Sequence, residues 1–353
     1  MIAQQLKPHG LIAALLYSSA LIFVAAQSNS PTASQIAEVV SRLKSSPAGE
    51  SAPADALALG QVLIREKRFA EAEELFRAML RNSPRDLTAL YGVALSAFNL
   101  GKALEAEPLA REAVKMALTP ESDPKKLTRE QRARAADALV LLAIVLAVNG
   151  NDREALRMAD QAVNVSADHF DAQFTLGRAR YGAGDTHGAV AALRAAVALN
   201  PNDARALFFL GTALERAGDI KGAISSYRQL IAKHPRAAEG HLGLGILLVR
   251  GGSEQVEEGI KELESAVALE PNQYEARVSL GRALLARGRA SESVPHLIRA
   301  GELAPGNPEP HYQLAIAYRR LGKNDLAAQE TALVKRIHES RRSPAAKSDS
   351  KKP

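Results

Sequence analysis

The feature that most constrains the fold is a recurrence at 34-residue spacing. Gly177, Gly211 and Gly245 fall in one column, and Pro201 and Pro235 fall in another. A fixed period of this length is typical of stacked helical hairpins, each of which is too small to bury its apolar face alone. We therefore expect function to reside in a surface rather than in an enclosed pocket.

The net charge of +6 at pH 7 is carried by the two ends of the chain. Residues 335–353 hold seven basic and two acidic residues, and Lys7 is the one charged residue in the first 26. Residues 27–334 are therefore neutral overall, and they lack the broad positive field that phosphate binding exploits. Nucleic acid is not expected as a partner.

The composition argues against several kinds of catalytic and metal site. The chain has no cysteine, which excludes disulfides, cysteine-ligated zinc and thiol nucleophiles. Its eight histidines show no spacing that would pair two metal ligands on one helix. Gly243 and Gly245 lie in a helical pattern without a preceding strand, unlike a dinucleotide-binding loop. We expect no cofactor, no metal and no catalytic residue, and histidines that pack in the core.

The first 26 residues have the pattern of an export signal. Lys7 precedes the apolar run 11–26, which ends in small residues before Gln27, where a signal peptidase would cleave. Cleavage would place the protein in the periplasm or outside the cell, with no membrane span. An uncleaved anchor and an ordinary buried helix are the alternatives, and the mass of the mature N-terminus distinguishes them.

Residues 27–52 are expected to form a linker rich in Ser, Pro and Ala. It contains one amphipathic stretch, in which Ile36, Val39, Val40 and Leu43 share a helical face, and this stretch is a candidate capping helix.

Two further segments differ in composition from the repeats. Residues 119–127 are expected to form a solvated insertion, after which Thr128 and Gln131 are spaced as a capping box that opens a long helix. Residues 339–353 lack apolar periodicity, and we expect them to form a disordered basic tail.

The columns of small residues resemble the tetratricopeptide repeat over residues 53–338, in about eight units. In that family each unit is a pair of helices that touch over small side chains. The first-helix column is Gly60, Ala94, Ala143, Gly177, Gly211, Gly245, Gly281 and Ala315, and the second-helix column is Ala72, Ala106, Ala155, Ala189, Ala223, Gly259, Ser293 and Ala327. The resemblance implies an all-α fold, a right-handed superhelical solenoid of helix-turn-helix units.

Turn residues support the same units. A glycine suited to a left-handed conformation ends the first helix at Gly101, Gly150, Gly184, Gly218, Gly288 and Gly322. Asn151, Asp185 and Asp219 follow three of these glycines and are suited to starting the second helix. Lys67 takes the glycine's place in the first unit, which is therefore expected to be looser.

The resemblance also implies a ligand-binding groove, because the first helices of such an array line its inner, concave wall. The residues predicted to face this groove are Arg65, Tyr91, Phe98, Phe174, Arg178, Tyr181, Phe208, Phe209, Arg216, Arg250, Arg282, Tyr312 and Arg319. They would bury apolar side chains of a peptide while the arginines take its carboxylates. The alternative is that the aromatic residues pack between units and the arginines are solvated.

These observations favour an exported scaffold or adaptor, not an enzyme, that binds peptide segments or protein partners on its concave face. The alternative is a structural subunit of an envelope complex for secretion, pilus or exopolysaccharide assembly. An adaptor would bind short peptides through the groove, whereas a subunit would copurify in a large particle. The sequence leaves the partner and the oligomeric state open.

Overall fold

The computed structural model of the protein describes residues 30–45, 54–119, 123–252 and 254–342, and all regular structure in these ranges is helical. Sixteen of the helices form eight consecutive pairs, from α3 with α4 to α17 with α18. This confirms the predicted all-α array of eight helical units. The predicted leader, residues 1–26, lies outside the described residues, as do residues 343–353 of the tail.

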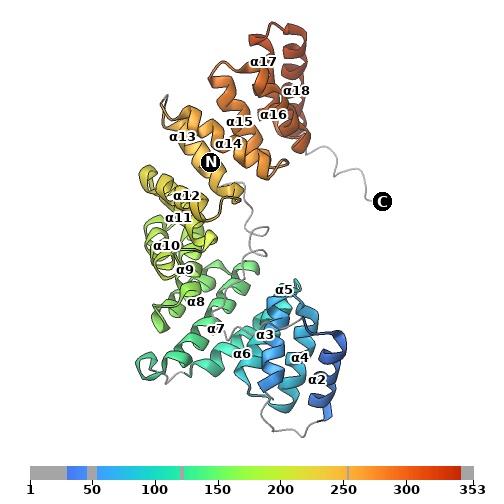
Figure 1. Ribbon diagram of the computed structural model, residues 1–353, viewed down its shortest axis with the longest axis vertical. Helices are drawn as coiled ribbons and strands as arrows, with labels where there is room; N and C mark the ends of the chain where they lie inside the picture. Colours follow the sequence, from blue (N-terminus) through green and yellow to red (C-terminus); the bar gives the residue numbers. More distant parts are fainter. Residues whose placement is uncertain (1–29, 46–53, 120–122, 253, 343–353) are drawn as a thin grey trace, which may run out of the picture. The chain divides into compact units, whose positions relative to one another are not determined.

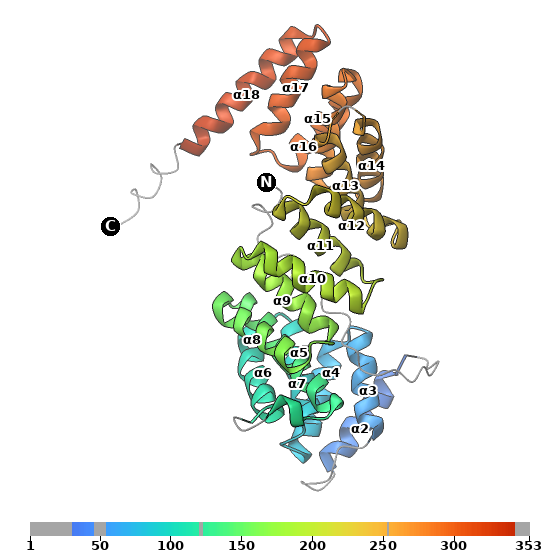
Figure 2. The same cartoon turned by 90° about the vertical axis from the view of Figure 1, so that its left-hand side faces the viewer.

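The chain divides into two units between Ala206 and Leu207, in the first turn of α11. The helices of unit 1 are α2 (Ala33–Ser45), α3 (Ala54–Arg65), α4 (Phe69–Asn82), α5 (Leu87–Asn99), α6 (Ala103–Ala117), α7 (Arg129–Val148), α8 (Asp152–Val165), α9 (Phe170–Ala183) and α10 (Thr186–Leu199). From α11 (Ala204–Ala217), unit 2 continues with α12 (Ile220–Lys233), α13 (Ala238–Arg250), α14 (Val256–Leu269), α15 (Tyr274–Ala286), α16 (Ala290–Leu303), α17 (Pro308–Arg320) and α18 (Asn324–Arg342). Within a pair the two helices lie side by side, as α9 and α10 (green) and α17 and α18 (red) do in both views (Figure 1, Figure 2). The insertion contains one short 3₁₀ helix, η2 (Pro124–Lys126).

Small residues let the two helices of a pair approach closely. Gly177 and Ala189 are both buried where α9 meets α10. A Cβ atom on Gly177 would lie 2.5 Å from Cγ of Leu193, one turn beyond Ala189. The glycine therefore makes room for a large side chain of the partner helix, and that leucine fills the contact without leaving a void.

The predicted turn glycines adopt the left-handed conformation. Their φ angles lie between 70° and 85° at Gly101, Gly150, Gly184, Gly218, Gly288 and Gly322. Asp185 and Asp219 then begin the second helix by accepting backbone N–H groups of Gly188 and Gly222, each at 2.9 Å. Asn151 is the N-cap residue of α8, as predicted, but its side chain makes no capping hydrogen bond.

The helix α2 docks on the first repeat. Its buried residues Ile36, Val40 and Leu43 pack in one apolar cluster with residues of α3 and α4. Because this amphipathic face is covered by the first pair, the capping position inferred from the sequence matches the structure.

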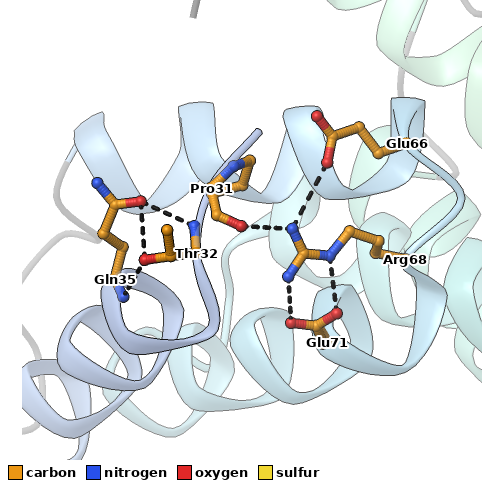
Figure 3. Close-up of polar contacts among 6 residues, drawn as sticks. All are labelled: Pro31, Thr32, Gln35, Glu66, Arg68 and Glu71. Atoms are coloured by element: carbon orange, nitrogen blue, oxygen red, sulfur yellow. Dashed lines mark hydrogen bonds and ion pairs between the residues drawn. The ribbon is translucent and has the colours of Figure 1, made fainter. Parts of the chain in front are cut away.

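The start of α2 is held by polar contacts (Figure 3). Thr32 and Gln35 form a reciprocal capping box, in which the Thr32 N–H donates to Oε1 of Gln35 at 2.8 Å and the Gln35 N–H donates to Oγ1 of Thr32 at 3.3 Å. Arg68, in the turn between α3 and α4, donates to the carbonyl of Pro31 and to both carboxylate oxygens of Glu71. One arginine therefore ties the segment before α2 to the first repeat.

The last helix is longer than the sequence indicated. Residues 339–342, expected to begin the disordered tail, form the last turn of α18, so that boundary is corrected. Ile337 is buried, and Nη2 of Arg341 donates to the carbonyl of Gly306 at 2.6 Å. These contacts extend the helix although its last turns have little apolar periodicity.

Candidate functional site

The first helices of neighbouring repeats contact one another and form a continuous row within each unit. In unit 1 these contacts join α3 with α5, α5 with α7, and α7 with α9. In unit 2 they join α13 with α15 and α15 with α17. We call the exposed side of each row the first-helix face, and it is the surface on which the predicted groove residues were placed.

Unit 1 carries a group of charged and aromatic side chains on this face, which we call the central cluster. It consists of Tyr91 on α5, Asp137 on α7, Asp171, Phe174 and Arg178 on α9, and Arg205 at the start of α11. Asp137, Asp171 and Arg205 are spaced 34 residues apart, so they occupy one column of the repeat. The repeat period therefore brings two acidic residues and one basic residue to the same position on successive first helices.

His169 fixes the start of α9 relative to α7. Its Nδ1 accepts the backbone N–H of Ala172 at 3.3 Å, which caps α9, and its Nε2 lies 3.2 Å from Oδ1 of Asp137. Thr128 and Gln131 form the predicted capping box that opens α7. The cluster is thus built from helices whose ends are set by side-chain hydrogen bonds.

Two arginines lie over one aromatic ring. The guanidinium carbon of Arg205 is 5.0 Å from the centroid of Phe174, and that of Arg178 is 5.7 Å from the same centroid. Arg205 also lies 5.7 Å from the ring of Phe170, which stacks on Phe174 at 5.9 Å. The rings hold both cations by cation–π attraction and limit their rotamers.

The carboxylates beside these arginines are only partly neutralised. Nη2 of Arg205 lies 2.8 Å from Asp203 but 3.8 Å from Asp171, which is longer than a hydrogen bond. The side chains of Asp137, Asp171 and Arg205 are only 15–18% exposed. These charged side chains are therefore largely removed from water, which is common at binding and catalytic sites.

The local environment shifts several pKa values. Burial raises the pKa of Asp171 to about 7, although the charges of Arg205 and His169 oppose the shift. Burial, followed by the positive charge of Arg205, lowers the pKa of Arg178 to about 10. Burial, together with the negative charges of Asp137 and Asp171, raises the pKa of Tyr91 well above its usual value. The shifts at Asp171 and Arg178 show that burial disfavours the charged form of each side chain, which a partner of opposite charge would stabilise, and Tyr91 keeps its neutral hydroxyl.

Of the predicted groove residues in unit 1, the structure brings Tyr91, Phe174 and Arg178 into the cluster. Arg65 is exposed at the end of α3, and Tyr181 is partly buried on α9. Phe98 is only 7% exposed and packs in the hydrophobic core with Ala94 and Leu139, so its predicted place in the groove is corrected. Its ring lies on the side of α5 that meets the neighbouring repeat.

The predicted groove residues of unit 2 do not gather in one place. Phe208 and Phe209 meet edge to face at 5.5 Å and are partly buried. Arg250 pairs with Glu215 at 2.9 Å, and Arg282 pairs with Glu309 at 3.2 Å. The remaining three, Arg216, Tyr312 and Arg319, are exposed. Arg319 lines an open surface depression with residues of α18.

The carboxylates of the central cluster, and the histidine that positions them, are not among the site residues predicted from the sequence. Asp137 and Asp171 share a column with Arg205, and this 34-residue spacing was a signal that could have identified them. The predicted groove counted only aromatic and cationic residues. His169 was expected to be a core imidazole, and it is indeed buried, but both its ring nitrogens have polar partners.

Two other histidines also lie beside carboxylates. Nδ1 of His241 lies 2.6 Å from Glu262, and Nδ1 of His311 lies 2.7 Å from Glu330, at equivalent positions of two repeats. Within the described ranges, no three His, Asp or Glu side chains are grouped so that they could hold a metal ion. The same ranges contain no helix long and apolar enough to span a membrane.

Comparison with known proteins identifies the repeat. The family model described as tetratricopeptide repeat matches residues 57–123, 174–229, 211–257 and 251–308, which together make up more than half of the chain. A comparison with curated proteins found none that matches.

Solved structures of repeat proteins match about half of the chain. A crystal structure of the MamA protein is 20% identical and covers 50% of this chain and 95% of its own, with a TM-score of 0.46. A MamA fragment from Desulfovibrio magneticus RS-1 is 21% identical and covers 49% of this chain and 97% of its own, with a TM-score of 0.46. YrrB, described as a TPR protein with an unusual peptide-binding site, is 19% identical and covers 52% of this chain and 94% of its own, with a TM-score of 0.45.

Proposed function

Because the chain belongs to the tetratricopeptide repeat family, we propose that it is a non-enzymatic scaffold whose first-helix face in unit 1 binds a peptide segment of a protein partner. The observation that carries this proposal is the central cluster, in which partly buried charges and aromatic rings from four successive first helices meet at one surface. The expectation that first helices line the concave wall of such arrays supports the choice of this face.

The cluster offers a peptide three kinds of contact. Arg178 and Arg205 would take a carboxylate of the partner, because two guanidinium groups held over one ring are already oriented. Asp137 and Asp171 would take a basic group, and the ring of Tyr91 would cover an apolar side chain. The desolvation of these charges has largely occurred during folding, so binding would not incur that cost again.

The test begins with peptides selected from a random display library against the chain starting at Gln27. Arg178→Glu is expected to lower the affinity for the selected peptides by about tenfold or more, since it places a negative charge where a carboxylate would bind. Binding is measured by fluorescence anisotropy at constant salt, and helix content by circular dichroism.

Arg157→Glu provides the matched control, because Arg157 is exposed on the second helix α8 and the charge change is the same. Its affinity should stay within about twofold of the wild type. Equal affinity of the Arg178→Glu chain and the wild type, at equal helix content, would remove the central cluster from the function. A stable large particle that forms regardless of either change would instead support an assembly subunit.

We further propose that the protein is exported by its first 26 residues and acts in the periplasm or outside the cell. This part of the proposal is supported by the apolar run and the small residues before Gln27. Mass spectrometry of the mature protein tests it. An N-terminus at Gln27 is expected, and an intact leader in a soluble fraction would contradict export.

A further inference from the structure

Asp171 lies in the central cluster without a cation among the described residues that is close enough for a hydrogen bond. Its side chain is 16% exposed, and its one ion pair within the described part of the chain is with Arg205, at 3.8 Å. Nη2 of Arg205 lies closer to Asp203, at 2.8 Å, and its guanidinium lies over the ring of Phe174. Burial therefore outweighs the nearby positive charges of Arg205 and His169, and it raises the pKa of Asp171 to about 7. The cluster leaves this carboxyl reachable from solvent and short of a positive partner.

The groups that face Asp171 do not supply that partner. Asp137, in the same repeat position on α7, lies 3.2 Å from Nε2 of His169. Burial lowers the pKa of His169, but the hydrogen bond and the charge of Asp137 outweigh it, so this pKa is raised overall. The imidazole therefore serves Asp137 and the start of α9 rather than Asp171. The titratable and charged groups around Asp171 are Tyr91 on α5, Asp137 on α7, His169 before α9, and Asp203 and Arg205 at the start of α11.

The neighbouring arginines have the opposite need. The guanidinium carbons of Arg178 and Arg205 lie 5.7 Å and 5.0 Å from the ring centroid of Phe174. Burial, followed by the positive charge of Arg205, lowers the pKa of Arg178 to about 10, because the two like charges repel. A carboxylate that contacts both guanidinium groups would reduce this repulsion, and its shape matches a guanidinium fork.

The two needs can be met at neighbouring points of the surface. Oδ1 of Asp171 and Nη2 of Arg205 are 3.8 Å apart. A cation held by Asp171 and an anion held by Arg205, each at about 2.8 Å, would therefore lie within about 10 Å of each other. An extended chain advances about 3.3 Å per residue, so this distance corresponds to at most about three residues. One short segment could carry both charges.

We propose that the central cluster selects a peptide segment whose basic and acidic side chains lie within about three residues of each other, with the basic one on Asp171. The inference rests on the proposed function and adds the chemistry of the ligand to it. A ligand cation on Asp171 stabilises the ionised carboxylate, and the proton that the free carboxyl carried is released to water. Acidification therefore weakens the complex, because protons compete with the basic side chain. Protonation of His169 acts in the same direction, since it adds positive charge beside the position of the ligand's cation.

Sequencing of the peptides selected from the random display library tests the charge pairing. The chain starting at Gln27 should enrich peptides that carry Lys or Arg within about three positions of Asp or Glu, compared with the unselected library. Asp171→Asn should keep the enrichment of acidic residues and lose that of basic residues, since the amide carries no charge to hold a cation. No enrichment of basic residues with the wild type, or equal enrichment with Asp171→Asn, would overturn the inference.

This outcome can be separated from a failure of the proposed function. Selected peptides that lose affinity with Arg178→Glu but show no charge pairing would overturn only the class of ligand inferred here. Peptides whose affinity is the same for Arg178→Glu and the wild type would refute the proposed function, and this inference with it.

The dependence of affinity on pH is the second test. A selected peptide without histidine, measured by fluorescence anisotropy at constant salt, should bind about tenfold more tightly at pH 8 than at pH 6. Asp171→Asn, or replacement of the peptide's basic residue by glutamine, should remove most of this difference. Asp152→Asn, on the exposed start of α8, is the matched control and should keep it. A difference of the same size in Asp171→Asn and the wild type, at equal helix content, would overturn the inference.

Discussion

Oδ1 of Asp137 lies 3.2 Å from Nε2 of His169, so a side chain in the middle of α7 holds the residue that begins α9. The other ring nitrogen accepts the N–H of Ala172. One imidazole therefore caps a helix and joins two neighbouring repeats. The arrangement of the central cluster depends on it, because Asp171 and Phe174 lie in the first turns of the helix that His169 begins.

We expect His169→Ala to destabilise the fold by about 1–2 kcal/mol, since it removes the cap and leaves the partly buried Asp137 without its partner. His169→Asn should restore part of this loss, because asparagine is a good N-cap residue but is too short to reach Asp137 in the same way. Urea unfolding of the three chains measures the difference. Equal stability of the alanine variant and the wild type would show that the imidazole does not join the repeats.

Asp171 should make stability depend on pH. Burial raises its pKa from 3.8 to about 7, so the folded state holds this proton more tightly than the unfolded state does. The stabilisation is complete below pH 3.8 and is lost as pH rises through 7. Asp171→Asn removes the dependence, and the variant should be more stable than the wild type at pH 8, by up to about 4 kcal/mol.

The comparison is made by thermal unfolding at pH 5 and pH 8. The difference in stability between Asp171→Asn and the wild type should be larger at pH 8 than at pH 5. Asp152→Asn, on the exposed start of α8, is the matched control and should show no such growth. A constant difference between Asp171→Asn and the wild type across this range would contradict the assigned cause.

The backbone of the repeats could be predicted from the sequence because it depends on residues with one dominant conformational role. Gly184 ends α9 with φ 85°, as a turn glycine should, and Gly177 is buried where α9 meets α10. Such positions tolerate few alternatives, so their spacing identifies the fold.

The site was harder to predict because the surroundings of a side chain depend on packing between repeats. Asp137 and Asp171 look like ordinary solvated helix residues until the contact between α7 and α9 places them together. Phe98 has the helical phase of a groove residue, yet its ring is buried in the core. The 34-residue period identifies which residues share a repeat position, but the burial of each of these residues depends on the size of its neighbours in the next repeat.

The loss of stability when a helix glycine is replaced by alanine should depend on the atoms that the added methyl group would meet. At Gly245 a Cβ would lie 2.9 Å from the carbonyl oxygen of Gly259, which cannot move without separating α13 from α14. At Gly211 it would meet the ring of Tyr227 at 2.7 Å, and a ring can shift. Gly245→Ala should therefore cost about 1–3 kcal/mol and Gly211→Ala less.

Gly182 in α9 is the control for this series, because a Cβ there meets nothing within 4 Å. Gly182→Ala should gain up to about 1 kcal/mol from helix propensity alone. Urea unfolding gives all three values. A larger loss at Gly211 than at Gly245 would show that the side-chain contact, and not the backbone contact, limits the approach of the helices.

Lys67 is a non-glycine residue in the conformation that the other turns give to glycine. Its φ is 63°, and the turn closes with a hydrogen bond from the Arg68 N–H to the carbonyl of Leu63 at 2.9 Å. Since a Cβ in this region costs about 1 kcal/mol, Lys67→Gly should be more stable than Lys67→Ala by about that amount. Both variants lose the lysine side chain, so the difference in their stability isolates the effect of the backbone conformation.

Gly184→Ala should lose a similar amount of stability for the same reason, because no atom lies within 4 Å of the added methyl group and only the left-handed backbone is strained. Differential scanning calorimetry of the three variants measures these effects, and an alanine at position 67 as stable as the glycine would show that this turn carries no strain.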